Sequence, residues 1–175
     1  MADPLTEITQ FLLDAYNTPI VYVTLVFLFA IAVAVVLPIP IEIVLLPPLL
    51  EQRYGYLAGL ALALAAGKTV GAFLIFVLGV NVEGSIRKWS HRFRFVEILV
   101  SKAEKFVRRT SYTGLYVLLS VPLMSDTIPL YVYSLFNEEG QALRRNMFLI
   151  ANFLAALNRT AILVVLFFLS FNLFG

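Results

Sequence analysis

The sequence predicts an all-α integral membrane protein, and three of its features indicate this fold class. Of its 175 residues, 61% are hydrophobic and 14% are charged, whereas soluble domains carry roughly 25% charged residues. Uncharged apolar runs fill most of its length, and prolines with an acidic residue interrupt two of these runs. A soluble domain of this composition would lack the polar residues to cover its core. We therefore expect a single membrane domain over residues 1–175.

The N-terminal part predicts a short amphipathic segment followed by a first membrane span. Apolar residues recur at helical spacing within residues 1–18, and no charge occurs from residue 15 to residue 41. A bilayer core of ~30 Å is crossed by about 20 apolar residues, so we expect a span over 19–37. The first 18 residues carry acids but no Lys or Arg, which is not typical of a secretory signal.

The stretch "LPIPIEIVLLPP", residues 37–48, predicts a re-entrant hairpin. Its four prolines, Pro38, Pro40, Pro47 and Pro48, break a helix because proline removes a backbone donor and clashes with the preceding turn. Glu42 adds a carboxylate, which is costly in hydrocarbon unless it is paired or reached by water. Broken backbone at membrane depth is tolerated only where protein buries it or where it lines a cavity. The prolines are therefore expected to shape a hairpin that buries Glu42.

The next apolar segment, residues 54–82, predicts a membrane span with one basic residue, Lys68. Small residues occur at every fourth position: Gly55, Gly59, Ala63, Gly67 and Gly71. This spacing places them on one helix face, where another helix can pack closely. The alternative is that glycine is simply common in membrane helices, although five small residues in register exceed that expectation.

Residues 83–110 predict a basic amphipathic helix at a membrane surface. This stretch contains eight Lys or Arg and three Glu, interleaved with Trp89, Phe93, Phe95 and Phe106. Basic amphipathic helices of this kind bind anionic leaflets. Basic and aromatic residues together also occur in nucleic-acid-binding proteins, but a cytoplasmic membrane loop is far commoner. We therefore expect no nucleic-acid partner.

The C-terminal part repeats the earlier pattern. Pro122, Asp126 and Pro129 break the apolar residues 111–136, a polar turn covers 137–145, and the last span, 146–175, carries the base Arg159. The spacings Pro38-x-x-x-Glu42 and Pro122-x-x-x-Asp126 are the same. Each acid precedes a span with one base, which lies 26 residues after Glu42 and 33 residues after Asp126.

Two similar units and a linker are therefore expected. The units cover about 19–82 and 111–175, with the basic linker 83–110 between them, and each is a re-entrant hairpin plus a transmembrane helix. If the N-terminus is cytoplasmic and 19–37 runs outward, the hairpins enter from opposite faces as an inverted repeat. Ten of the 13 Lys and Arg then face the cytoplasm, as the positive-inside rule requires. This predicts a multi-pass plasma-membrane protein.

The same residues resemble a known family. "PIPIE" with "GYLAGLALALAAGKTVGAFLIFVLG" resembles the first half of DedA proteins, also called VTT-domain or SNARE-associated proteins, and "SVPLMSDTIPLYVYSLF" with "LRRNMFLIANFLAALNR" resembles their second half. The resemblance covers about residues 35–165. It implies two facing re-entrant hairpins and movement of lipids across the bilayer. Bacterial members are implicated in recycling polyprenyl-phosphate carriers with the proton motive force, and eukaryotic relatives scramble phospholipids.

The intramembrane charges are the predicted functional residues. Glu42 and Asp126 are expected to couple protons or substrate, and Arg159 and Lys68 are expected to contact a lipid phosphate or to serve as counterions. Arg159 ranks above Lys68 because guanidinium is the better phosphate ligand. The alternative for Glu42 is a permanent pair with Lys68 or Arg159 that locks the fold.

The function predicted from these residues is a lipid flippase or scramblase, with proton coupling through the acids as one option. Membrane lipids, and protons if transport is coupled, are the expected partners. The alternatives are a proton-coupled exporter of small cationic or amphipathic solutes and a non-transporting membrane scaffold. The sequence contains no cysteine and a single histidine, and it has no nucleophile–base pair or phosphate loop. No enzymatic activity, cofactor or metal site is therefore expected, and the oligomeric state stays open.

Overall fold

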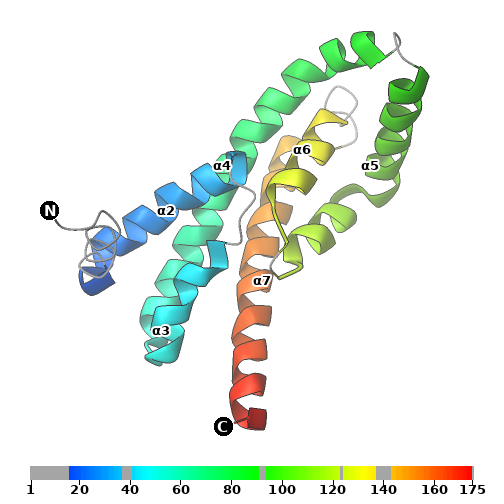
Figure 1. Cartoon of the computed structure of the whole chain (residues 1–175). Helices are drawn as coiled ribbons and strands as arrows, with labels where there is room; N and C mark the ends of the chain where they lie inside the picture. The colour runs from blue at the N-terminus through cyan, green and yellow to red at the C-terminus, as the bar shows by residue number, and fades with distance from the viewer. Residues whose placement is uncertain (1–15, 37–40, 91–93, 123, 137–142, 175) are drawn as a thin grey trace, which may run out of the picture.

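Every regular element that the structure describes is a helix. The structure is a computed structural model that describes residues 16–36, 41–90, 94–122, 124–136 and 143–174. In chain order the elements are α2 (Pro19–Val35), η1 (Ile41–Leu45), α3 (Leu46–Leu50), α4 (Tyr54–Ser90), α5 (Arg94–Ser120), α6 (Thr127–Leu135) and α7 (Arg145–Phe174). Figure 1 shows them as one bundle around α4 and α7, which run in opposite directions.

Helix α4 is the centre of the bundle, because it contacts α2, η1, α3, α5, α6 and α7. Its buried residues recur every three or four positions, among them Leu57, Leu60, Leu64 and Ala72, so one stripe of the helix faces its neighbours. Within α4 and α7, residues 54–79 and 145–170 are each long and apolar enough to cross a membrane.

Residues 16–51 form a first hairpin. Its arms are α2 and η1–α3, and they run side by side, since the Tyr22 hydroxyl donates to the Val44 carbonyl at 3.3 Å. At the open end the Tyr16 hydroxyl donates to Glu51 Oε2 at 2.7 Å. Burial and this hydrogen bond raise the pKa of Tyr16 above its ordinary value. The hairpin therefore opens beside Tyr54, the first residue of α4.

The predicted span over 19–37 coincides with α2. Helix α2 has 17 residues, at the short end of the range that can cross a bilayer core, and η1–α3 returns to the end from which α2 started. The return depends on contacts between Tyr16 and Glu51, which lie 35 residues apart.

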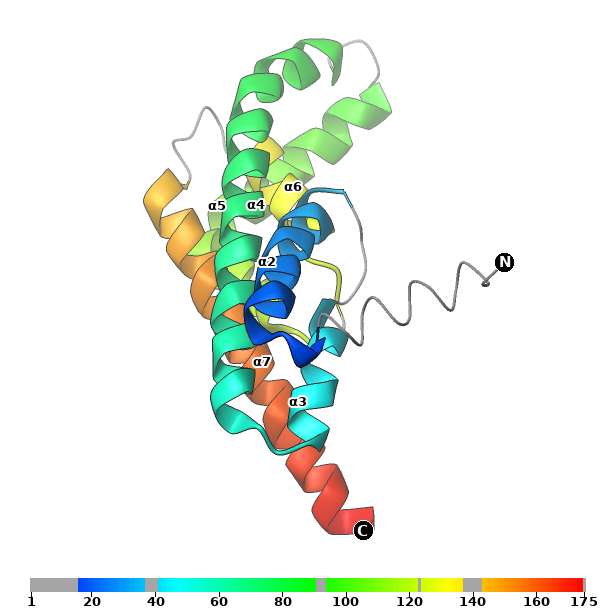
Figure 2. The same ribbon diagram turned by 90° about the vertical axis from the view of Figure 1, so that its left-hand side faces the viewer.

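Residues 112–135 form a second hairpin, made of the end of α5 and α6. Thr110 Oγ1 and the Tyr133 hydroxyl lie 2.6 Å apart, and the Arg144 amide donates to the Tyr112 hydroxyl at 2.6 Å. This hairpin therefore opens beside Arg145, where α7 begins. Because α4 and α7 run in opposite directions, the two hairpins open toward opposite ends of the bundle (Figures 1 and 2).

The basic region is not the single helix predicted over 83–110. Residues 83–90 continue α4, and a separate helix, α5, begins at Arg94. Ser111 then interrupts α5 with φ 48° and ψ −144°, a conformation that non-glycine residues rarely adopt. The break at Ser111 separates the basic part of α5 from the apolar part that belongs to the second hairpin.

Only half of the predicted glycine ridge packs against a helix. A Cβ at Gly67 would lie 2.4 Å from the Phe27 carbonyl oxygen, and one at Gly71 would lie 2.6 Å from Ala34 Cβ, so α2 packs closely on α4 at both positions. A Cβ at Gly55 or Gly59 would meet no atom within 4 Å. At these two positions none of the described helices covers the ridge, because α2 crosses α4 at an angle and diverges from α4 toward the start of α2 (Figure 1).

The glycines predict two opposite effects of alanine substitution. Gly67→Ala should destabilise the protein by about 1–3 kcal/mol, because the new methyl group meets rigid backbone. Gly59→Ala should leave stability unchanged or raise it by up to about 1 kcal/mol, since alanine is the better helix former. Thermal unfolding in detergent micelles measures both variants. Equal effects at the two positions would contradict the observed packing of α2 on α4.

Candidate functional site

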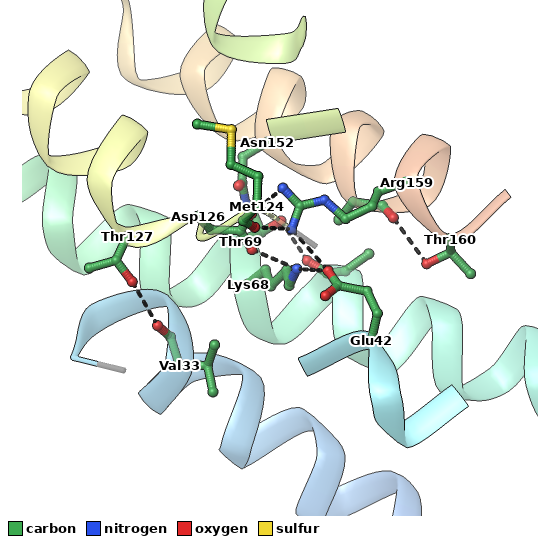
Figure 3. Close-up of polar contacts among 12 residues, drawn as sticks. Val33, Glu42, Lys68, Thr69, Met124, Asp126, Thr127, Asn152, Arg159 and Thr160 are labelled. Atoms are coloured by element: carbon green, nitrogen blue, oxygen red, sulfur yellow. Dashed lines mark hydrogen bonds and ion pairs between the residues drawn. The ribbon is translucent and has the colours of Figure 1, made fainter. Parts of the chain in front are cut away.

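The four intramembrane charges predicted from the sequence meet at one point. Lys68 Nζ lies 2.5 Å from Glu42 Oε1 and 2.5 Å from Asp126 Oδ2. Arg159 Nη1 lies 3.0 Å from Glu42 Oε1, and its Nη2 lies 2.7 Å from Asp126 Oδ1. The four side chains are 1–5% exposed. We call Glu42, Lys68, Asp126 and Arg159 the tetrad (Figure 3).

Each member of the tetrad comes from a different element. Glu42 lies in η1, in the second arm of the first hairpin, and Asp126 occupies the position before the first residue of α6, without a side-chain capping hydrogen bond. Lys68 and Arg159 lie 14 residues after the first residues of α4 and α7, about 21 Å along each helix. The hairpin tips thus bring the acids to the middle of the two long helices.

The contacts among the four charges settle the pairing that the sequence left open. Each acid contacts both bases, and each base contacts both acids. The two carboxylates and the two cations sum to zero charge. Buried charges are tolerated when they are paired in this way. The desolvation cost is still large, so a buried ion pair is weak evidence for stability by itself. Neutralising one member would leave an uncompensated buried charge.

Further hydrogen bonds join the two hairpins near the tetrad. The Thr127 hydroxyl donates to the Val33 carbonyl at 3.1 Å, and the Tyr131 hydroxyl donates to the Val35 carbonyl at 3.0 Å. These acceptors lie in the last turn of α2, where helical carbonyls lack intrahelical partners. The sequence analysis missed Thr127 and Tyr131. The only sequence signal for these two residues is that both carry a hydroxyl group and follow the proline-interrupted stretch that begins at Pro122.

Several buried polar atoms around the tetrad have no hydrogen-bond partner. They are Glu42 Oε2, Arg159 Nε, Ser120 Oγ and Ser125 Oγ. Arg159 Nη1 also donates to the Met124 carbonyl at 3.0 Å. Buried polar groups are normally satisfied, so unsatisfied ones indicate a place for water, an ion or a ligand. The region around the two tips therefore has spare hydrogen-bonding capacity.

Three of the described prolines lie in the first turns of helices. Pro47 and Pro48 occupy the first turn of α3, and Pro129 occupies the first turn of α6. A proline costs no hydrogen bond there, because first-turn amides have no intrahelical acceptor. Pro122 lies in the turn after α5. Pro38 and Pro40 lie outside the described residues.

An apolar groove between η1–α3 and α7 reaches the tetrad. It encloses about 90 Å³, and its only polar lining residues are Glu42 and Thr160. The Thr160 hydroxyl donates to the Ala156 carbonyl at 3.1 Å. Exposed apolar side chains, including Ile43 and Leu46, line the mouth of the groove. The groove is thus an apolar depression of the surface that has Glu42 of the tetrad among its lining residues.

The described ranges hold no group of three or more His, Cys, Asp or Glu residues that could bind a metal ion. The tetrad supplies only two carboxylates, and both contact cations. Comparison of the chain with protein-family models, with curated proteins and with solved structures gives no match.

Proposed function

We propose that this protein moves lipids across a membrane, with the tetrad as the polar site through which the headgroup passes. The observation that carries the proposal is a neutral cluster of four buried charges at the junction of two oppositely directed hairpins. Ionisable residues within apolar helices are costly and mark substrate or proton pathways. The resemblance to DedA proteins supports the same function.

The apolar surface of the bundle supports a membrane location. Exposed large hydrophobic side chains follow the outward face of α4, including Leu62, Val70 and Leu74, and continue on α7 at Ile150 and Leu154. Of the apolar windows in α4 and α7, 50% and 22% of the residues are buried. A core helix of a soluble protein would be mostly buried, whereas a lipid-facing helix exposes its apolar side chains.

Two similar units provide a basis for alternating exposure of the site. Each unit has a hairpin with an acid after its tip and a long helix with a base at the same distance from its start. In this interpretation both hairpins are re-entrant and the units are inverted repeats. Transporter sites commonly lie at such repeat interfaces near the bilayer midplane. Movement of one hairpin away from the tetrad would open it toward one side.

The charges of the tetrad offer a way to bind and release a headgroup. When a proton or a neighbouring group neutralises Glu42 or Asp126, Lys68 and Arg159 lose part of their counter-charge. A phosphate can then replace the carboxylate, since guanidinium binds phosphate through two parallel hydrogen bonds. Return of the ionised carboxylate releases the phosphate. The acyl or prenyl chains stay in lipid throughout.

The orientation follows from the distribution of basic residues. Residues 83–90, residues 94–110 and the start of α7 lie at one end of the bundle, and Tyr16 and Arg53 lie at the other. The positive-inside rule places the basic end in the cytoplasm. Residue 16 and the end of α7 then face outward, which is opposite to the cytoplasmic N-terminus that a complete span over 19–37 predicts.

Reconstitution into vesicles tests the function. With the purified protein present, a fluorescent lipid in the inner leaflet should become accessible to a membrane-impermeant quencher much faster than in protein-free vesicles. A pH-sensitive dye inside the vesicles measures coupled proton movement in the same preparation. Proton flux with a cationic solute but without lipid movement would favour the exporter. The absence of both lipid movement and proton flux would favour a scaffold and contradict the proposal.

A further inference from the structure

A basic hollow lies on the part of α5 that precedes the break at Ser111. It encloses about 440 Å³, and the described residues that line it are Ser101, Glu104, Lys105, Arg108 and Arg109. Positions three or four residues apart lie on the same face of a helix, so these side chains share one face of α5. Three bases and one acid give the lining a net charge of +2. None of the five residues belongs to the tetrad, and we call the site the α5 hollow.

The opposite face of α5 joins this helix to the second hairpin. Val107 is fully buried there, and Thr110 Oγ1 lies 2.6 Å from the Tyr133 hydroxyl of α6. The Phe106 ring also packs on Tyr133, edge to face, with the ring centroids 6.0 Å apart. The three bases of the α5 hollow are exposed, and they are therefore accessible to a ligand from outside the bundle.

The surroundings of the hollow fit a lipid better than a soluble anion. Phe106 directly follows Lys105, and its side chain is 45% exposed. At the same end of the bundle, Met147 and Ile150 of α7 are exposed apolar residues. On interfacial helices, apolar side chains enter the boundary of the acyl chains while Lys and Arg contact anionic headgroups. The α5 hollow therefore lies beside both kinds of contact that an anionic lipid offers.

The charge of the lining selects among lipid headgroups. Every phospholipid has a phosphate, and the guanidinium groups of Arg108 and Arg109 can bind its oxygens through parallel hydrogen bonds. A choline headgroup adds a quaternary ammonium beside the phosphate, which a positively charged lining repels. A glycerol headgroup adds no cation, so the lipid stays anionic. The volume of about 440 Å³ lies within the range of about 300–1,000 Å³ that is typical of small-ligand sites.

We propose that the α5 hollow binds the headgroup of an anionic phospholipid in the leaflet at the basic end of the bundle. The bound lipid holds the basic part of α5 at the membrane surface and, through Phe106 and Thr110, against Tyr133 of the second hairpin. The inference goes beyond the proposed function, because this lipid stays at the surface and is not the cargo that passes the tetrad. It requires a membrane surface at the basic end, and it does not require lipid movement.

Native mass spectrometry of the full-length protein in detergent tests the site. The probes are dihexanoyl phosphatidylglycerol and dihexanoyl phosphatidylcholine, titrated separately at about 0.15 M salt, where distant exposed charges are largely screened. Phosphatidylglycerol should bind about tenfold or more tightly than phosphatidylcholine, since several bases attract it without opposing a choline. An equal concentration of inorganic phosphate should not displace it. Equal affinity for the two lipids would overturn the proposal, and displacement by phosphate would overturn it in favour of a soluble anion.

Two exposed lysines of α5 provide a matched control. Lys105 lines the hollow, whereas Lys102 is also exposed and does not line it. Lys105→Gln should weaken phosphatidylglycerol binding about fivefold or more, because a hydrogen bond between charged groups is lost. Lys102→Gln removes the same charge and should weaken binding less than about twofold at this salt concentration. Equal weakening by the two variants would indicate diffuse attraction to the whole basic helix and would overturn the site. Binding is measured without transport, so phosphatidylglycerol binding without lipid movement would reject the proposed function and retain this site.

Discussion

Removing one acid and one base of the tetrad together should cost the protein much less stability than removing either alone. Breaking a buried ion pair by deleting one partner costs about 3–5 kcal/mol, whereas replacing both can be nearly neutral. Asp126→Asn and Arg159→Gln should each lower the unfolding temperature strongly. The double variant should recover most of the loss, because Glu42 and Lys68 still form a neutral pair at 2.5 Å.

The double variant with both acids neutralised is the matched control. Glu42→Gln with Asp126→Asn leaves Lys68 and Arg159 as two buried cations without a counter-charge. Its loss of stability should equal or exceed the sum of the two single losses. Thermal unfolding of the three single variants and the two double variants in one detergent measures these differences. If the loss of stability in each double variant equals the sum of its two single losses, the result would contradict a shared charge cluster. It would favour separate aqueous pockets for the four charges.

The sequence contains enough information to find the members of this cluster. Glu42 and Asp126 share the spacing to a preceding proline, and Lys68 and Arg159 are each the one charge of an apolar segment. A lone charge in such a segment must find a partner, so four of them predict a common site. The sequence does not say which acid meets which base. The answer is set by how deeply each hairpin reaches between α4 and α7, which depends on long-range packing.

Other features could not be predicted because competing local signals are equally strong. The apolar residues 19–37 fit a complete span almost as well as an arm of a hairpin. The hydrogen bond from Tyr16 to Glu51 brings the end of α3 back to the start of α2, and no local pattern encodes it. The glycine spacing is regular from Gly55 to Gly71, but α2 covers only its second half. A periodic pattern defines a helix face without defining how much of it a neighbour covers.

Glu42→Gln should lower the rate of lipid movement by at least about tenfold. The amide keeps the shape of the side chain but cannot exchange a proton or return as an anion, and a charged hydrogen bond contributes enough free energy for a change of this size. Glu51→Gln is the matched control. Glu51 lies at the open end of the same hairpin, its side chain is 49% exposed, and it contacts Arg53 at 3.5 Å. Its variant should transport at the wild-type rate in the vesicle assay.

Stability and transport must be separated for Glu42, because its loss also unbalances the tetrad. The double variant Glu42→Gln with Lys68→Gln leaves Asp126 and Arg159 as a neutral pair at 2.7 Å. It should therefore unfold close to the wild-type temperature and still fail to move lipid. If transport returns together with stability, the Glu42 carboxylate serves only to balance the charge of Lys68. If stability returns alone, the carboxylate is required for transport itself, and a permanent lock formed by Glu42 is excluded.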